Sequence, residues 1–190
     1  MYELFLDAVS SEGRLTLLQK KQSVAKEVFS LAGNESSLLP ARVFSFLQDR
    51  GIDPKDLGHI YVVNGPGSFT GIRTICLFVN TLAYIYPHLT LTPISFFDLY
   101  KDYPIVKQSS RRDVFVKKQK DDIIEVVMIS QLKAYLAGTQ QWQGSMDMSL
   151  WDLSDISLQA HYDEIWVIAG IDSWSSKFVQ PLYIKKPNIS

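Results

Sequence analysis

The sequence has little cysteine, no long apolar run and no excess of either charge, and each absence excludes a class of protein. One cysteine in 190 residues cannot form a disulfide within the chain, which fits a reducing compartment. A helix that crosses a bilayer needs roughly 20 consecutive apolar residues. The most apolar stretch, residues 72–86, is shorter than that and contains Arg73. We therefore expect no membrane-spanning segment.

The charges are nearly balanced, with 19 lysines and arginines against 20 aspartates and glutamates. A protein that tracks a phosphate backbone or an anionic membrane normally has a basic patch. We therefore expect any role in nucleic-acid metabolism to be indirect. The first seven residues include Glu3 and Asp7, where a secretory signal peptide would carry positive charge. With the single cysteine, this predicts a cytoplasmic protein.

What is present begins with strand patterns. Residues 2–9 and 14–18, separated by a polar turn, predict a hairpin. Residues 24–29 predict a third strand, although their spacing is also compatible with a helix. Residues 59–63 are apolar without alternation, which indicates a central strand covered on both faces.

A short amphipathic helix is predicted between these strands, with Ser36 or Ser37 as its N-cap and Gly51 just past its end. Pro40 fits its first turn, where a missing N–H would have had no partner within the helix. The apolar residues at helical spacing are Leu39, Val43, Phe46 and Leu47.

The most informative segment follows the strand at residues 59–63. It is a glycine-rich turn consisting of Gly65, Pro66, Gly67, Ser68, Phe69, Thr70, Gly71, Ile72 and Arg73. Glycines adopt backbone conformations that other residues avoid, and Ser68 or Thr70 is suited to cap a following helix. The segment therefore predicts a strand-to-helix turn.

The helix after this turn is expected to run to about Tyr86, with Arg73 as its one charged residue. Its apolar residues form one side at Ile72, Ile75, Cys76, Val79 and Ala83, and much of the remainder at Leu77, Phe78, Leu82 and Ile85. A helix that is apolar all round is buried all round. If one side packs on its own sheet, the other must contact a partner.

The second half is less clearly patterned. We predict a strand at residues 90–94, a short helix at 96–100 and a strand pair at 114–116 and 123–128. A helix at 130–136 and a central strand at 162–169 follow. Residues 138–156 show no clear period. Residues 107–112 are the best candidate for a seam between two halves.

Three segments of the chain resemble the TsaB family. The turn Gly65–Arg73 matches the family signature GPGSFTG-L/I-R without a mismatch. Ser110–Phe115 is similar to the family segment ARRGEVY, and Gln180–Pro187 is similar to its closing EPLYLR-x-P. Leu38–Pro40 also falls where the family has a helix that begins with a Leu-Leu-Pro-like stretch. The matches follow the family order and touch most of the chain.

The resemblance implies an α/β protein of the actin/Hsp70-like (ASKHA) fold, with an N-terminal lobe at residues 1–106 and a reduced C-terminal lobe at residues 107–190. It implies a partner subunit that acts with the catalytic TsaD and the ATPase TsaE in making threonylcarbamoyladenosine in tRNA. It implies no chemistry, cofactor or metal in this chain. The chain departs from the family at Ala8 and Val9 and at Cys76–Phe78, where relatives have smaller or more polar residues.

On this basis we expect a partner interface on the two helices, formed by Leu39, Val43, Phe46, Ile75, Phe78, Val79 and Leu82. Phe78→Asp is then expected to abolish partner binding and to leave the domain folded. The same helices also suit a homodimer. A homodimeric enzyme of the same fold, a kinase or a metallopeptidase with its own nucleotide or metal site, remains the alternative.

Other candidate sites have simpler interpretations. The glycine turn opens a helix and is a possible phosphate site, but it lacks a Gly-Lys-Ser/Thr ending and Pro66 has no N–H. Asp7 ends the first strand, where actin-like folds place an acid facing metal or phosphate. Ala8 and Val9 do not allow backbone to approach phosphate closely, so we favour a surface or loop-capping aspartate.

The remaining candidates are also expected to be structural. The histidines at positions 59, 88 and 161 lack the close His or Cys neighbour that metal sites usually need. Ser130 and Lys133 match a Ser-x-x-Lys tetrad without its companion motifs, which favours a helix start. Arg111 and Arg112 precede Asp113 directly, which favours a solvated strand entrance.

Overall fold

A computed structural model describes residues 1–31, 38–150, 153, 155–171 and 175–185. The chain forms two compact units, residues 1–96 with 164–190 and residues 97–163. This division differs from the expected lobes 1–106 and 107–190. The expected seam at residues 107–112 begins inside strand β6, which is hydrogen-bonded to strands of the second unit on both sides.

The first unit contains a five-stranded sheet of order β3-β2-β1-β4-β5. Its strands are β1 (Tyr2–Asp7), β2 (Glu12–Gln19), β3 (Gln22–Ser30), β4 (Leu57–Gly65) and β5 (Thr90–Ser95). The first three strands are antiparallel neighbours, whereas β4 pairs parallel with both β1 and β5. The hairpin, the third strand and the central position of the strand at residues 59–63 are therefore confirmed.

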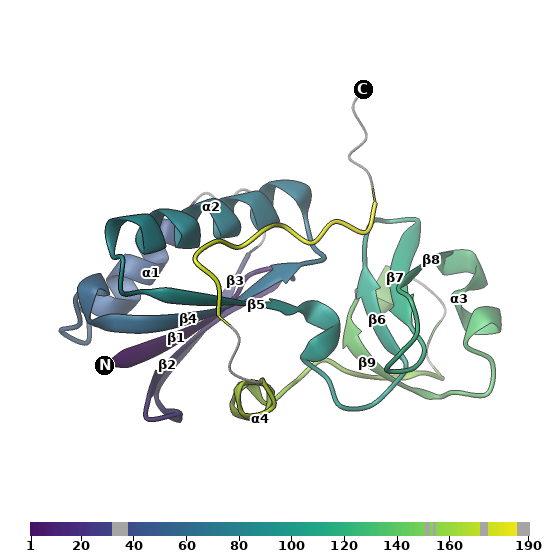
Figure 1. Ribbon diagram of the computed structural model, residues 1–190. Coiled ribbons are helices and arrows are strands. Elements are labelled where there is room, and N and C mark those ends of the chain that lie inside the picture. Colours follow the sequence, from purple (N-terminus) through teal and green to yellow (C-terminus); the bar gives the residue numbers. More distant parts are fainter. Residues whose placement is uncertain (32–37, 151–152, 154, 172–174, 186–190) are drawn as a thin grey trace. The chain divides into compact units, whose positions relative to one another are not determined.

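Helices cover both faces of this sheet, with α2 on one face and α4 on the other (Figure 1). The helices of the unit are α1 (Leu39–Gln48), the 3-10 turn η2 (Pro54–Asp56), α2 (Phe69–Ile85) and α4 (Glu164–Ala169). Helix α1 begins after Leu38, and the expected caps Ser36 and Ser37 lie outside the described residues. Gly51 lies just past its end with a φ of 67°, as expected of a helix-terminating glycine.

The prediction of a strand at residues 162–169 is wrong, because Glu164–Ala169 is helical. The run Ile165–Ile168 is too short for its periodicity to separate a strand from a helix. In the structure the buried residues are Glu164, Val167 and Ile168, which are spaced by three and by one and so lie on one helical face.

The second unit contains its own five-stranded sheet, of order β10-β9-β6-β7-β8. Its elements are β6 (Ile105–Gln108), β7 (Asp113–Lys117), β8 (Glu125–Met128), α3 (Ile129–Tyr135), β9 (Gln141–Ser145), η4 (Met148–Leu150) and β10 (Ser157–Gln159); η3 (Phe96–Asp98) spans the division. The expected strand pair and helix are confirmed. Trp142 and Leu132 are central to its apolar core.

Helix lengths also bear on the predicted absence of a membrane span. Within the part of the chain that the structure describes, none of the helices is both long enough and apolar enough to cross a bilayer.

Candidate functional site

Ser68 begins helix α2 at the end of the glycine-rich turn. Its backbone is extended, with φ −60° and ψ 136°, and its side-chain oxygen accepts a hydrogen bond from the Gly71 N–H at 3.0 Å. The hydroxyl thereby satisfies one of the N–H groups that the first turn of a helix leaves without a partner. The sequence left Ser68 and Thr70 open as caps, and the structure assigns the role to Ser68.

Two glycines of the turn allow close approach by other parts of the chain. A Cβ on Gly67 would lie 2.7 Å from the Val9 carbonyl oxygen, in the loop after β1. A Cβ on Gly65 would lie 2.7 Å from the Leu182 carbonyl oxygen, and Gly65 has a φ of 130° that L-residues rarely adopt. The space that a phosphate cradle needs beside Gly67 is filled by Val9.

Asp7 is buried at the end of β1, and its Oδ1 accepts a hydrogen bond from the Val9 N–H at 3.1 Å. This contact between an aspartate and the amide two residues on is a loop-capping arrangement. Of the two roles favoured from the sequence, a surface or a loop-capping aspartate, the structure supports loop capping. The side chain is buried rather than on the surface.

The seven residues expected at a partner interface are all buried within the first unit: Leu39, Val43, Phe46, Ile75, Phe78, Val79 and Leu82. They pack in the apolar core and so are not free to meet a partner on the surface of the folded chain. Periodicity identified the apolar positions correctly, but it did not determine which of them the chain covers itself.

The outer faces of α1 and α2 present a different set of apolar side chains. Leu77 is 70% exposed, Tyr84 is 87% exposed and Phe44 of α1 is 42% exposed, with Ile85 and Leu38 also on the surface. Residues 70, 73, 77, 81 and 84 of α2 are all exposed, and their spacing of three or four places them along one face. We refer to Phe44, Leu77, Tyr84 and Ile85 as the outer apolar face.

A groove of about 520 Å³ adjoins this face at the end of α2. Its walls are formed by Asn80, Thr81, Ala83, Tyr84, Pro87, Lys177 and Phe178. Among the described wall residues, the charged group is the Lys177 ammonium, which donates to the Pro87 and Leu89 carbonyl oxygens at 2.5 and 3.2 Å. Since this charge is directed at main chain, the groove suits apolar atoms better than an anion.

The histidines of the first unit contact main-chain or hydroxyl groups. The two ring nitrogens of His59 lie 2.7 Å from Thr90 Oγ1 and 2.9 Å from Thr92 Oγ1, and His88 Nε2 lies 2.8 Å from the Lys55 carbonyl oxygen. Burial lowers the pKa of His59, and Lys21 lowers it further against the opposing effect of Glu3. Among the described residues, no group of three or more His, Cys, Asp or Glu side chains is arranged to hold a metal ion.

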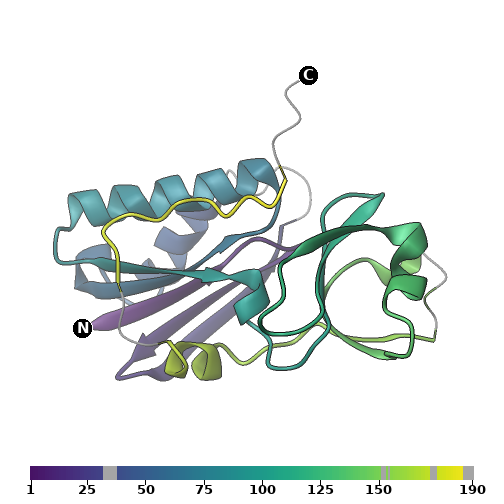
Figure 2. The ribbon, with the colours of Figure 1, turned by 45° about the vertical axis from the view of Figure 1, so that its right-hand side comes forward.

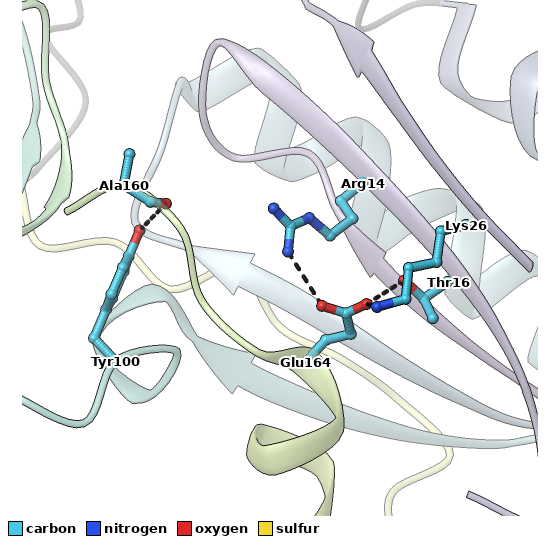
Figure 3. A network of polar contacts seen from close by, with 6 residues as sticks. All are labelled: Arg14, Thr16, Lys26, Tyr100, Ala160 and Glu164. Atoms are coloured by element: carbon cyan, nitrogen blue, oxygen red, sulfur yellow. Dashed lines mark hydrogen bonds and ion pairs between the residues drawn. The ribbon is translucent and has the colours of Figure 1, made fainter. Parts of the chain in front are cut away.

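No pattern in the sequence indicates the buried ionic cluster around Glu164, which is shown in Figure 3. The Glu164 carboxylate is 1% exposed and accepts from Thr16 Oγ1 at 2.9 Å and Arg14 at 3.1 Å, and it pairs with Lys26 at 2.6 Å. Burial raises its pKa, but Lys26, its own N–H and Thr16 outweigh that effect, so the pKa lies below its ordinary value. The cluster attaches α4 to strands β2 and β3.

The candidates of the second unit take structural positions. Lys133 pairs with Asp155 at 2.8 Å, so its ammonium is engaged away from a Ser-x-x-Lys site. Ser130 lies in the first turn of α3, as the helix-start interpretation expects. Arg111 and Arg112 are exposed directly before β7.

The chain is similar in sequence to proteins of threonylcarbamoyladenosine biosynthesis. A family model described as TsaD, tRNA N6-adenosine threonylcarbamoyltransferase, matches residues 31–94, which include α1, β4, α2 and β5. Over 70 residues the chain is 36% identical to the tRNA threonylcarbamoyladenosine biosynthesis protein TsaB of Bacillus subtilis (strain 168). That match covers 37% of this chain and 31% of the relative, so it spans less than a third of the relative's length.

Two solved structures extend the likeness to the whole fold. One is described as an uncharacterized protein with similarity to peptidase YEAZ from Pseudomonas aeruginosa; it superposes with a TM-score of 0.71 at 16% identity and covers 97% of this chain and 99% of its own. The second, YeaZ from Pseudomonas aeruginosa, has a TM-score of 0.57 at 17% identity and covers 75% of this chain and 74% of its own. The α/β, actin-like fold expected from the sequence is confirmed, and so is the resemblance on which that expectation rested.

Proposed function

Because the chain carries the signature turn and the fold of the TsaB (YeaZ) family, we propose that it is a non-catalytic subunit that binds and activates a TsaD-type subunit during threonylcarbamoyl transfer to tRNA adenosine. In this role it contacts a TsaE-type ATPase as a further partner and meets tRNA only through the complex. The setting is the cytoplasm.

The outer apolar face is the observation that carries the proposal. Leu77 and Tyr84 expose most of their side chains on the same side of α2, and Phe44 extends the face onto α1. Exposed apolar side chains gathered on one helix face support a contact site, because their exposure to water is unfavourable. Aromatic side chains at such a site are also the ones most often found at the energetic centre of interfaces.

The surroundings of the face set the chemistry of the partner. In the groove beside Tyr84, the Lys177 ammonium is bonded to main-chain carbonyl oxygens. Arg73, on the same side of α2, lies over the Phe69 ring, 3.9 Å from its centroid. We expect the partner surface to be apolar at its centre, with a side chain that enters the groove. A helix packed on α2 is the simplest partner element, because ridges on one helix fit grooves on another.

Light scattering on a size-exclusion column tests the proposal with the native chain, the TsaD-type subunit and variants of one exposed residue each. Leu77→Asp places a charge at the centre of the outer apolar face and is expected to weaken the complex at least tenfold. Ile123→Asp is the matched control, since Ile123 is 80% exposed but belongs to the second unit. It should leave binding unchanged.

Two results would contradict the proposal. If the native chain forms no complex even with ATP and the TsaE-type ATPase present, the scaffold role fails. If Leu77→Asp and Ile123→Asp bind equally well, the partner uses another surface. A homodimer that Leu77→Asp dissociates would instead assign the outer apolar face to a second copy of this chain, in line with its self-complementary apolar character.

A further inference from the structure

The segment Ser176–Tyr183 runs alongside helix α2, as Figures 1 and 2 show from two directions. We refer to it as the strap. It forms no strand of its own apart from one bridge to β5, in which Ser176 and Leu91 exchange both main-chain hydrogen bonds at 2.7 and 2.9 Å. The strap is therefore held chiefly by the side chains and turns that it crosses.

Two asparagines bind the main chain of the strap. Asn80 of α2 accepts from the Val179 N–H at 2.8 Å and donates to the Val179 carbonyl oxygen at 3.0 Å. A side-chain amide that satisfies both groups of one residue imitates the pairing of a neighbouring β-strand. Since main-chain groups are the same in every residue, these contacts recognise an extended conformation rather than a particular side chain.

Asn64 continues the pattern at the end of β4. The Asn64 side-chain amide donates to the Gln180 carbonyl oxygen at 2.8 Å. The Asn64 main-chain carbonyl oxygen accepts from the Leu182 N–H at 2.9 Å. Along the strap, the main-chain groups of Ser176 are hydrogen-bonded to β5 and those of Val179 to α2. Gln180 and Leu182 are hydrogen-bonded to Asn64 of β4. This regularity is typical of peptide recognition by addition of a strand, in which main-chain bonds provide affinity and pockets provide specificity.

Side chains of the strap supply the specificity. Val179 is fully buried. The Tyr183 ring stacks on Phe69 with centroids 4.7 Å apart and an interplanar angle of 25°, and its hydroxyl accepts from Arg73 Nε at 3.1 Å. The two anchors are four residues apart, at the two ends of the segment that the asparagines bind.

The signature turn fits this ligand closely. A Cβ at Gly65 would collide with the Leu182 carbonyl oxygen at 2.7 Å, so a glycine is needed there for the strap to approach. Phe69 and Arg73 contact the Tyr183 side chain, which stays partly exposed. Gly65, Phe69 and Arg73 of the signature turn therefore contact the strap. The proposed function gives these three residues no contact with the partner.

We propose that a second site binds an extended peptide and that its ligand is the chain's own strap, docked in cis. This strap groove is not the groove beside Tyr84. It consists of Asn64, Gly65, Phe69, Arg73 and Asn80. The proposal concerns contacts within this chain and does not depend on the proposed function. It predicts that the groove also binds the same segment supplied as a separate peptide, once the attached strap is displaced.

The test uses the full chain with Val179→Asp, which removes the buried anchor from the strap and leaves every groove residue unchanged. A fluorescent peptide with the sequence Ser176–Tyr183 is titrated with this variant, and anisotropy is recorded. We expect the peptide to bind the Val179→Asp chain saturably. We expect it to bind the native chain at least tenfold more weakly, because the groove of the native chain is occupied by its own strap. A peptide that carries Asp in place of Val179, and the double variant Val179→Asp with Asn80→Ala, should both bind at least tenfold more weakly.

Absence of binding to the Val179→Asp chain up to about 1 mM peptide, the range of effective concentration that a short tether provides, would overturn the proposal. Equal binding of the native and Asp-containing peptides would also overturn it. If circular dichroism shows that Val179→Asp does not fold, amide hydrogen exchange decides. Asn80→Ala should then accelerate exchange at Val179 and Leu182, whereas its exposed neighbour Thr81→Ala should not; equal exchange in both variants rejects the groove.

Discussion

The rings of Phe44 and Phe78 meet edge to face, with centroids 5.8 Å apart and planes at 85°, and they join the outer side of α1 to the inner side of α2. Phe44 is 42% exposed, whereas Phe78 is 8% exposed. The pair therefore marks the boundary between the core of the first unit and its outer apolar face. Substitutions at the two positions should separate stability from binding.

Phe78→Asp is expected to unfold the first unit rather than to affect binding alone, contrary to the expectation from the sequence. Removal of a buried phenylalanine costs about 3–5 kcal/mol, and the buried unpaired carboxylate adds to that cost. Phe44→Ala should cost about 1 kcal/mol, because the ring keeps much of its contact with water. Urea denaturation of both variants measures the difference, and equal stabilities would contradict the assigned burial.

Glu164 should contribute to stability only where its carboxylate is ionised. Glu164→Ala is expected to lower the free energy of unfolding by about 3 kcal/mol at pH 7, because it removes the buried carboxylate that Arg14, Thr16 and Lys26 share. Lys26→Ala should cost less than about 1 kcal/mol, since Lys26 is largely exposed and its charge is screened by solvent. Thermal or urea denaturation at one salt concentration compares the two.

The lowered pKa of Glu164 sets the pH dependence of this contribution. A carboxylate whose pKa is lower in the folded state stabilises that state above its unfolded value of 4.5, and the contribution is lost as pH falls through the lower folded pKa. The native chain should therefore lose more stability than Glu164→Gln as pH falls below about 4.5. Parallel curves for the two proteins over that range would show that Glu164 is not ionised in the cluster.

His59 should act in a higher pH range. Its pKa is lowered chiefly by burial, so the folded state binds the proton less readily than the unfolded chain does. Stability from neutral His59 is therefore complete above the ordinary value of 6.5 and is lost as pH falls through the lower folded pKa. Titration of the ring by NMR measures the pKa directly, and His59→Gln should reduce the loss of stability just below pH 6.5.

The sequence predicted the strands, the turn and the two helices of the first unit because each carries a local pattern. The wrong assignment at residues 162–169 has a physical cause, since four apolar residues fit a strand or a helix equally well. The burial of this segment depends on Glu164, whose partner Arg14 lies 150 residues earlier in the chain, with Lys26 nearly as far away. Local periodicity carries no information about such a contact.

The interface residues show the same limit in another form. Leu77 and Phe78 are adjacent, yet one is exposed and the other is buried, because successive residues on a helix point about 100° apart. The sequence predicted that α2 is apolar on all sides. Which of its faces are buried depends on the packing of α1, the sheet and the strap against it. Of the two asparagines that hold the strap, Asn64 belongs to the informative segment around the signature turn, but its contact with the strap was not predicted. Asn80 is a polar residue on a largely apolar helix, and no local pattern indicates its role.

Cys76 offers a direct measurement of how firmly α2 is packed. Its side chain is buried, and burial raises the pKa of its thiol to about 11, so little thiolate is present at neutral pH. A thiol reagent should therefore modify the native chain at least a hundredfold more slowly than the unfolded chain, at a rate set by transient opening of the unit. Because α2 bears Asn80 and most of the outer apolar face, this rate also separates a loss of packing from a change confined to the surface. Leu77→Asp lies outside the core and should leave the rate unchanged, whereas Phe78→Ala should raise it in proportion to the stability lost. A fast reaction in the native chain would mean that α2 is not held as the structure describes.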